Sequence, residues 1–218
     1  MNFGSKLATI TANTPTSVTV TSPSGSGTVP VTVTTAAGAS NPLNFYYIGV
    51  PFKASLSAAS GPSAGGNTVT ISGTGLATAS SVAFGGNNAT PTVTSDSVLS
   101  VTVPAGTSGS VGVSITTTGG TNNGFSYTYV DPPTIASLTP TSGSTSGGTA
   151  VTITGTDLST TQSVTFDGVT APFSVINSTT VSAVPPPGNV GAVDVVVSTT
   201  GGNATAAAGF TYVAGAGI

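Results

Sequence analysis

The sequence of 218 residues contains no cysteine, histidine, glutamate, arginine or tryptophan. Without cysteine there is no disulfide framework to hold a small scaffold together. Acid–base catalysis would have to rest on two lysines and five scattered aspartates, and a serine nucleophile would lack an evident base. These absences exclude a disulfide-rich scaffold and predict that the protein is not an enzyme and uses no cofactor.

Charge is equally scarce, at 3% of residues against roughly a quarter in an ordinary domain. The net charge of −3 is spread thinly and forms no basic patch, so we expect no nucleic-acid partner and no binding to anionic lipid. No apolar run approaches the roughly 20 residues of a membrane helix, which predicts no membrane insertion. No apolar leader region is visible at the start of the sequence either.

The residues that are abundant favour β-structure. Alanine, threonine, serine, glycine and valine fill most of the chain, and valine and threonine are β-branched. The stretch 147–158, Gly-Gly-Thr-Ala-Val-Thr-Ile-Thr-Gly-Thr-Asp-Leu, combines a glycine turn with alternating apolar and polar residues, which is the period of a half-buried strand. A closely similar stretch occurs at 65–76, with Val69 lying 82 positions before Val151. The chain is therefore built from repeats.

Three repeats follow from the shared landmarks, with Val31, Val113 and Val195 each 82 positions apart. Each full repeat contains about seven short strands separated by turn residues, which predicts an all-β protein of tandem immunoglobulin-like β-sandwiches. The expected domains are a partial repeat at 1–48 and complete sandwiches at 49–131 and 132–218. The residues expected in the two complete cores are Val69, Ile71, Phe84, Val113, Ile115, Val151, Ile153, Phe166, Val195 and Val197.

The third repeat resembles the IPT/TIG family of immunoglobulin-like domains. The residues that carry the resemblance are Pro133–Gly143, Gly147–Leu158, Val164–Gly168 and Gly209–Val213. The resemblance implies the fold of this family, whose members include surface adhesins, receptor ectodomains, accessory modules of polysaccharide enzymes, phage particle proteins and DNA-binding domains. It does not select one of these roles, because a fold hosts many functions.

The first repeat begins at Met1-Asn2-Phe3, the equivalent of Val82-Ala83-Phe84, and has no counterpart of the 31 residues Pro51–Ser81. Valines in such a repeat would face a half-built core beside an open sheet edge, and open edges pair with other chains. Two explanations stay open. The sequence is a fragment of a longer protein, or a strand from another subunit or protein completes the repeat by β-strand addition.

Several residues suggest chemistry but also have a structural interpretation. Asp157 and Asp167 could offer oxygen ligands to Ca²⁺, but both also suit turns, and we expect no metal site. The pairs Gly65-Gly66, Gly119-Gly120, Gly147-Gly148 and Gly201-Gly202 lack the lysine of a phosphate loop and are interpreted as hairpin turns. Five tyrosines could stack on sugars, although their position near repeat ends favours packing with the hydroxyl reaching water: Tyr46, Tyr47, Tyr127, Tyr129 and Tyr212.

Together these features predict a non-enzymatic structural or adhesive protein of a surface filament, cell envelope or phage particle. Its expected location is extracellular, on a cell surface or in a virion. Its expected partners are other copies of itself or neighbouring surface or particle proteins, through β-strand addition at 1–48. The alternative is a carbohydrate-binding accessory module of a larger secreted or surface protein, which requires an exposed aromatic platform and glycan partners.

Overall fold

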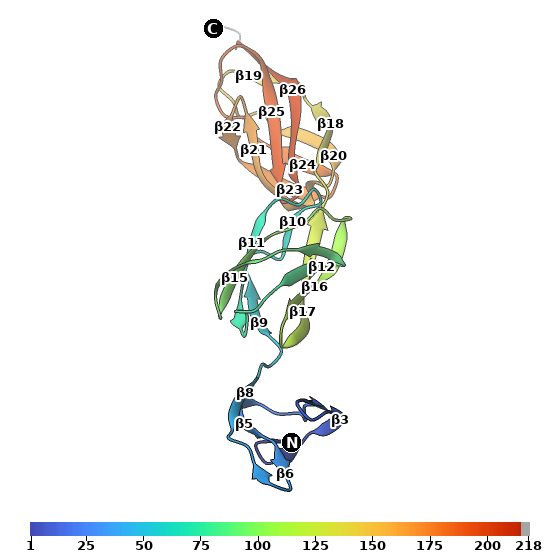
Figure 1. The fold of residues 1–218 in the computed structure, drawn as a ribbon. Coiled ribbons are helices and arrows are strands. Elements are labelled where there is room, and N and C mark those ends of the chain that lie inside the picture. The colour runs from blue at the N-terminus through green and yellow to red at the C-terminus, as the bar shows by residue number, and fades with distance from the viewer. Residues whose placement is uncertain (215–218) are drawn as a thin grey trace.

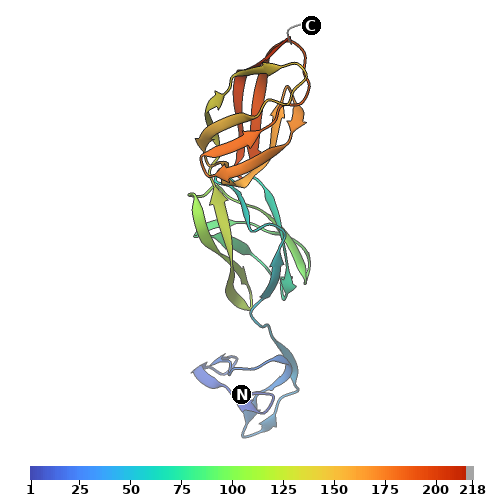
Figure 2. The ribbon, with the colours of Figure 1, turned by 180° about the vertical axis from the view of Figure 1, so that it is seen from behind.

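The computed structural model describes residues 1–214 and shows an all-β chain arranged as three units in a row. Figure 1 places the N-terminal unit at one end and the last strand at the other, and Figure 2 shows the same row from behind. Among the described residues, one short 3₁₀ helix, η1 (Leu158–Thr160), interrupts the strands. No helix in residues 1–214 has the length and apolar character needed to cross a membrane.

The middle unit, here called the second module, is a closed sandwich of two sheets. One sheet has the strand order β14-β15-β11-β9, and the other has the order β10-β17-β16-β12-β13. The strands of this module are β9 (Phe52–Leu56), β10 (Ser60–Pro62), β11 (Thr68–Thr74), β12 (Ser81–Phe84), β13 (Asn87–Ala89), β14 (Thr92–Ser95), β15 (Val98–Thr102), β16 (Gly109–Thr117) and β17 (Gly120–Val130).

The third module repeats this arrangement. Its sheets have the orders β18-β20-β24-β23 and β19-β26-β25-β21-β22, so each strand has a counterpart in the second module. The strands are β18 (Thr134–Thr139), β19 (Ser142–Ser144), β20 (Val151–Thr156), β21 (Thr161–Phe166), β22 (Val169–Ala171), β23 (Phe173–Asn177), β24 (Thr180–Ala183), β25 (Gly191–Thr199) and β26 (Gly202–Val213).

The N-terminal unit, residues 1–48, is here called the half-module. It consists of one sheet in the order β2-β1-β5-β8 and two separate hairpins, β3-β4 and β6-β7. Its strands are β1 (Asn2–Phe3), β2 (Lys6–Leu7), β3 (Thr9–Asn13), β4 (Val18–Thr21), β5 (Gly27–Thr32), β6 (Thr34–Thr35), β7 (Gly38–Ala39) and β8 (Leu43–Tyr47).

Alternation along the strands explains both closed cores. In β11 the side chains of Val69 and Ile71 are fully buried, while Thr68 on the other face is exposed. Burying such a side chain stabilises the fold by about 1.5–3 kcal/mol. All ten residues expected in the cores are buried, so this part of the prediction is confirmed.

Two details of the sequence interpretation are wrong. Each complete module has nine strands and not seven, because short strands such as β10 and β13 carry no apolar alternation of their own. The pairs Gly65-Gly66 and Gly147-Gly148 do have positive φ, but they lie in crossovers between the two sheets and not in hairpins. Gly119-Gly120 and Gly201-Gly202 do lie in hairpins, β16-β17 and β25-β26.

Candidate interaction surface

The half-module contains the counterparts of only part of a complete module. Strand β1 pairs with β5 through Phe3 and Val31, as β12 pairs with β16 through Phe84 and Val113. The β3-β4 hairpin corresponds to β14-β15, and β8 corresponds to β17. Among residues 1–48, no strand corresponds to β9, β10 or β11. The half-module therefore has one sheet and a single hairpin of the other.

An aromatic triplet is the part of the core that all three units share. In the half-module, Phe3 and Phe45 meet edge to face with ring centroids 5.0 Å apart, and Phe45 meets Tyr47 in the same way at 5.0 Å. The second module repeats the geometry with Phe84, Tyr127 and Tyr129, at 5.2 Å for both contacts. The third does so with Phe166, Phe210 and Tyr212, at 5.3 and 5.2 Å.

The last tyrosine of each triplet is held by a hydrogen bond to a proline carbonyl. Tyr47 Oη donates to the Pro23 carbonyl at 2.7 Å. The equivalent bonds are Tyr129 to Pro104 at 2.8 Å and Tyr212 to Pro186 at 2.7 Å. The half-module therefore has the same ring geometry and the same tyrosine-to-proline hydrogen bond as the closed modules.

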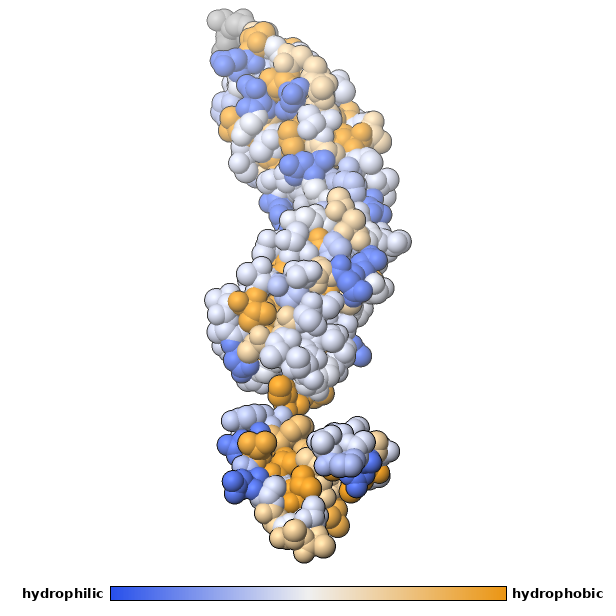
Figure 3. All heavy atoms as spheres, viewed as in Figure 1, coloured by the Kyte–Doolittle hydropathy of each residue, from blue (hydrophilic) through white to orange (hydrophobic). Residues whose placement is uncertain are grey.

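The core residues of the half-module are less buried than those of the closed modules. Val18 and Val31 are only half-buried, whereas their counterparts Leu99 and Val113 are buried. Phe45 is 37% exposed, and its counterpart Tyr127 is fully buried. A hollow of about 370 Å³ lies over the half-module, lined by residues that include Val18 and Val33. Figure 3 shows apolar residues gathered on this unit and on the joint above it.

Two strands of the half-module lack a neighbour that their counterparts in the second module have. In the second module, β15 pairs with β14 on one side and β11 on the other, whereas β4 pairs with β3 alone. Strand β17 has β10 as a parallel neighbour, whereas β8 pairs with β5 alone. Neither β4 nor β8 contains a charged residue or a proline, which are the usual protection of an open edge.

The tyrosines divide into two groups. Tyr127, Tyr129 and Tyr212 are buried, as the packing interpretation predicts, and burial raises their pKa values. Their hydroxyls bond to protein groups, so the expectation that these hydroxyls reach water is wrong: Tyr127 Oη donates to the Asn67 side chain at 3.1 Å. Tyr47 is half-buried in its triplet.

Tyr46 differs, because it is 64% exposed on the opposite face of β8. It begins a line of exposed apolar side chains at every second position, continuing with Ile48, Val50 and Phe52 across the first joint. The second joint has Thr128, Val130, Pro132 and Thr134 at the equivalent positions. This joint stripe, Tyr46-Ile48-Val50-Phe52, is an aromatic and aliphatic surface that the second joint lacks.

Each joint passes closely over a hairpin of the module that it enters. A Cβ placed on Gly119 would overlap the carbonyl oxygen of Gly49 in the first joint, and one on Gly201 would overlap that of Asp131 in the second. The equivalent position in the half-module is Ala37. Glycine is thus present at the two hairpins that a joint covers, and the uncovered hairpin has alanine.

A buried cation distinguishes the second module. Lys53 Nζ donates to the carbonyl oxygen of Val113 at the β-bulge of β16 and lies 5.4 Å from the centre of the Phe125 ring. Burial lowers the pKa of Lys53, because desolvation disfavours the charged form.

The third module has its β25-β26 bulge earlier along the strand, between Val193 and Val195, and no cation of the described residues lies there. Ile135 stands where the second module has Lys53, since both pair with the glycine at the bulge of the neighbouring strand. The Asp194 carboxylate instead accepts a hydrogen bond from the Ala208 N–H at 2.8 Å. Different side chains therefore act at the bulges of the two modules.

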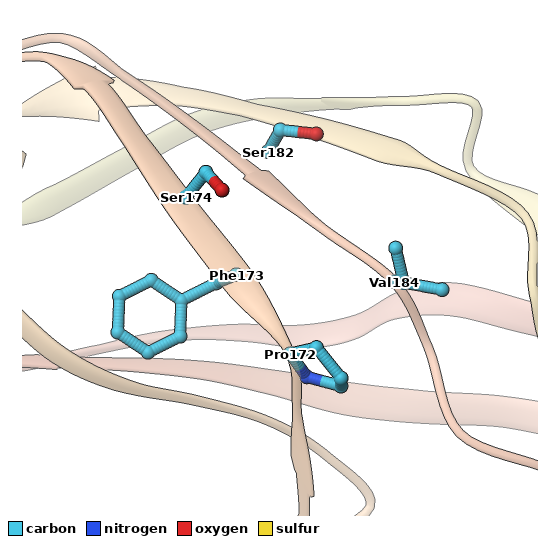
Figure 4. A pocket seen from close by; sticks show the side chains of 5 residues that line it. All are labelled: Pro172, Phe173, Ser174, Ser182 and Val184. Atoms are coloured by element: carbon cyan, nitrogen blue, oxygen red, sulfur yellow. The ribbon is translucent and has the colours of Figure 1, made fainter.

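A smaller hollow and two of the aspartates offer no built site. The hollow in Figure 4 measures about 140 Å³ and presents the Ser174 and Ser182 hydroxyls of β23 and β24, which is smaller than the roughly 300 Å³ of small ligand pockets. Asp157 and Asp167 both adopt left-handed backbone conformations, as the turn interpretation predicts. Within residues 1–214, no three His, Cys, Asp or Glu side chains group as metal ligands would.

The sequence profile of the IPT/TIG domain matches this chain twice, at residues 51–129 and 133–213. The chain belongs to the IPT/TIG family. The two matches correspond to the second and third modules, which confirms the resemblance and the fold class inferred from the repeats. No curated protein matches the chain.

Solved structures of similar fold include an extracellular region of plexin A4, with 24% identity and a TM-score of 0.51, over 76% of this chain and 16% of that one. The I9–I11 tandem of titin has 14% identity and a TM-score of 0.39, over 90% and 77%. A surface glycan-binding protein, SGBP-B from Bacteroides uniformis, has 18% identity and a TM-score of 0.37, over 74% and 49%. The plexin match supports the fold of the IPT/TIG modules, and the chain spans a small part of the plexin's length.

Two functional features had only weak signals in the sequence. The joint stripe can be read as apolar residues at every second position from Tyr46 to Phe52, but only the structure shows that each of them stays more than half exposed. The difference between Ala37 and Gly119 is visible in the repeat alignment, but its meaning needs the position of the joint.

Proposed function

We propose that this IPT/TIG chain is a non-enzymatic structural or adhesive protein of the extracellular space, in a surface filament, a cell envelope or a phage particle. Its partners are other copies of itself or neighbouring surface or particle proteins. The observation that carries the proposal is the half-module, which presents a partly apolar and open-edged surface, with Lys6 as its one charged side chain, at one end of a row of closed modules. The closed modules act as a spacer that holds this surface away from the other end.

The surface chemistry fits contact and not catalysis. The loops and faces offer threonine, serine and asparagine groups, and only seven side chains in the chain are charged, two lysines and five aspartates. Contacts made by such groups should depend weakly on salt, since screening acts on charge pairs.

Immunogold labelling of intact cells, and of filaments and particles purified from the source organism, tests the proposal. The expected result is label on an external surface, a filament or a particle. Label confined to the cell interior, with none on any assembly, would contradict it.

A second candidate function is glycan binding at the joint stripe, which the exposed rings of Tyr46 and Phe52 favour. Aromatic faces stack on the apolar faces of sugars, and the surrounding uncharged hydroxyls would supply hydrogen bonds. A glycan array with the native chain and Tyr46→Ala tests it. The matched control is Leu43→Ala, which removes a non-aromatic and even more exposed side chain from the same strand. Binding that Leu43→Ala keeps and Tyr46→Ala loses supports glycan recognition, and equal loss in both would count against it.

A further inference from the structure

Building on the proposed function, we propose that the half-module binds an extended segment of a separate polypeptide whose strand residues are uncharged. This donor segment alternates valine or isoleucine with threonine or serine. It adds one antiparallel strand to β4 and one parallel strand to β8.

The complete modules of the same chain show what occupies these two edges. Strand β11 lies antiparallel to β15, with Val69 opposite Val101 and Ile71 opposite Leu99. Strand β20 occupies the same place beside β24, with Ile153 opposite Val181. The counterparts of Val101 and Leu99 in the half-module are Val20 and Val18, so a strand with the same alternation would cover them.

A second strand completes the other sheet. Strand β10 runs parallel to β17, and β19 runs parallel to β26, with a glycine at the middle of each. A Cβ on Gly61 would overlap the Tyr127 hydroxyl, and one on Gly143 would lie 2.9 Å from the Phe210 ring. The segment that adds to β8 therefore needs glycine over the Phe45 ring.

The acceptor surface is already formed. The triplet Phe3-Phe45-Tyr47 and the bond from Tyr47 to Pro23 have the geometry of the closed modules, although the covering strands are missing from residues 1–48. Gly25 lies against the Tyr47 ring as Gly106 lies against Tyr129. Little ordering of this sheet is needed for binding, which favours affinity.

Ala37 disfavours covering strands that enter through a joint like the other two. In the closed modules the covering strands follow a joint whose carbonyl group lies against Gly119 or Gly201. The methyl group of Ala37 occupies that space in the half-module, so covering strands led in by an equivalent joint would clash with it. A segment supplied by a separate chain needs no such joint.

Phe45 sets a preference between two kinds of donor. Where the second module has Tyr127, the covering crossover supplies Asn67, whose amide donates to the tyrosine hydroxyl at 3.0 Å. Where the third module has Phe210, Thr149 takes that place and its Cβ lies beside Gly143. Phe45 has no hydroxyl, so a donor of the third-module type leaves no amide without its partner.

The probe is a fluorescently labelled synthetic peptide with the sequence of residues 133–163, added to the intact chain. Anisotropy measures binding, and hydrogen exchange locates it. Three comparisons sharpen the test. The 133–163 peptide with Thr149→Asn, the residue of the second module, should bind a few-fold more weakly, about the loss of one hydrogen bond. The 133–163 peptide with Ile153→Asp should bind at least about tenfold more weakly, because a carboxylate would be buried.

The third comparison changes the acceptor. Val20→Lys puts a charge on the inner face of β4 and should weaken binding at least about tenfold. Thr19→Lys puts the same charge on the outer face of the same strand and should leave binding within about twofold, as for a surface substitution.

The expected result is saturable binding with new amide protection in β4 and β8. The proposal is overturned if the native chain does not bind the peptide, or if Val20→Lys and Thr19→Lys behave alike. It is also overturned if light scattering shows that the chain alone is a dimer whose β4 and β8 amides are already protected, because a second copy would then cover the surface. These outcomes do not depend on where the protein is found, so immunogold labelling judges the proposed function separately.

Discussion

The half-module and the third module contain the same aromatic triplet, yet their cores differ. In the third module, Phe166, Phe210 and Tyr212 lie between two sheets and are almost completely buried. In the half-module, Phe3 is buried but Phe45 remains 37% exposed. One sheet with its hairpins is therefore enough to place the rings, while the second sheet is needed to exclude water from them.

Removing an aromatic ring from a closed core should lower stability more than any other substitution considered below. Phe166→Ala should lower the free energy of unfolding of the third module by about 3–5 kcal/mol, because the ring leaves a cavity between two sheets. Phe3→Ala should cost clearly less, because the half-module has only one complete sheet over that ring. Urea denaturation followed by hydrogen exchange in β25 and β5 measures both.

The control for this pair is Ile176→Ala, which removes a side chain 61% exposed on β23 and should change stability by no more than about 0.5 kcal/mol. Equal costs for Phe3→Ala and Phe166→Ala would mean that the half-module has a closed core in solution.

A smaller effect is expected at the joints. Gly201→Ala forces a methyl group against the Asp131 carbonyl, so the joint must move. Overpacking of this kind costs about 1–3 kcal/mol, and the angle between the second and third modules should change. Small-angle X-ray scattering and denaturation measure the two effects. The reverse change, Ala37→Gly, should leave the scattering curve unchanged, and an unchanged curve for Gly201→Ala would contradict the role assigned to the joint.

Lys53→Ile places in the second module the residue type that the third module has at the equivalent position, Ile135. Its effect on the free energy of unfolding should be smaller still. It removes a desolvated ammonium group, which is favourable, but deprives the Val113 carbonyl of its donor at a cost of about 1–3 kcal/mol. We expect a net change within about 1 kcal/mol by urea denaturation, because the two terms oppose each other. Lys53→Ala should be worse, since it loses the donor and the packing of the stem. A larger loss for isoleucine than for alanine would show that this account of the bulge is wrong.

The smallest effect is confined to alkaline pH. Burial and the negative charge of Asp167 raise the pKa of Tyr212 above its ordinary value of 10.0. The folded state therefore holds the phenolic proton longer than the unfolded chain, so stability is fully present below pH 10.0 and is lost as pH rises through the raised pKa. Denaturation of the third module at pH 9 and pH 11 should show this loss, and Tyr212→Phe should reduce it. A loss of equal size in Tyr212→Phe would assign the effect to another group.

Repetition made much of the fold predictable. Val31, Val113 and Val195 align the three units, and alternation such as Val69-Thr70-Ile71 identifies inward-facing residues. The crossovers at Gly65 and Gly147 could not be distinguished from hairpins by sequence. A glycine pair predicts a backbone with positive φ, but it does not predict which sheet the next strand joins. The exposure of Tyr46 was equally hidden, since an aromatic side chain near a repeat end suits both packing and binding.

The parallel pairing of β10 with β17 and of β19 with β26 determines how the chain would carry mechanical tension. Each pair joins the first part of a module to its last strand. In the second module the Ser63 N–H donates to the Val130 carbonyl and the Thr128 N–H to the Ala59 carbonyl, both at 2.8 Å. A pull on the two ends of a module would act along these strands and load their hydrogen bonds together in shear. The half-module has no such clamp, since β8 has an open edge. Under tension the half-module would therefore unfold at a lower force than the two closed modules. A donor strand bound to β8 would add the missing hydrogen bonds and raise that force.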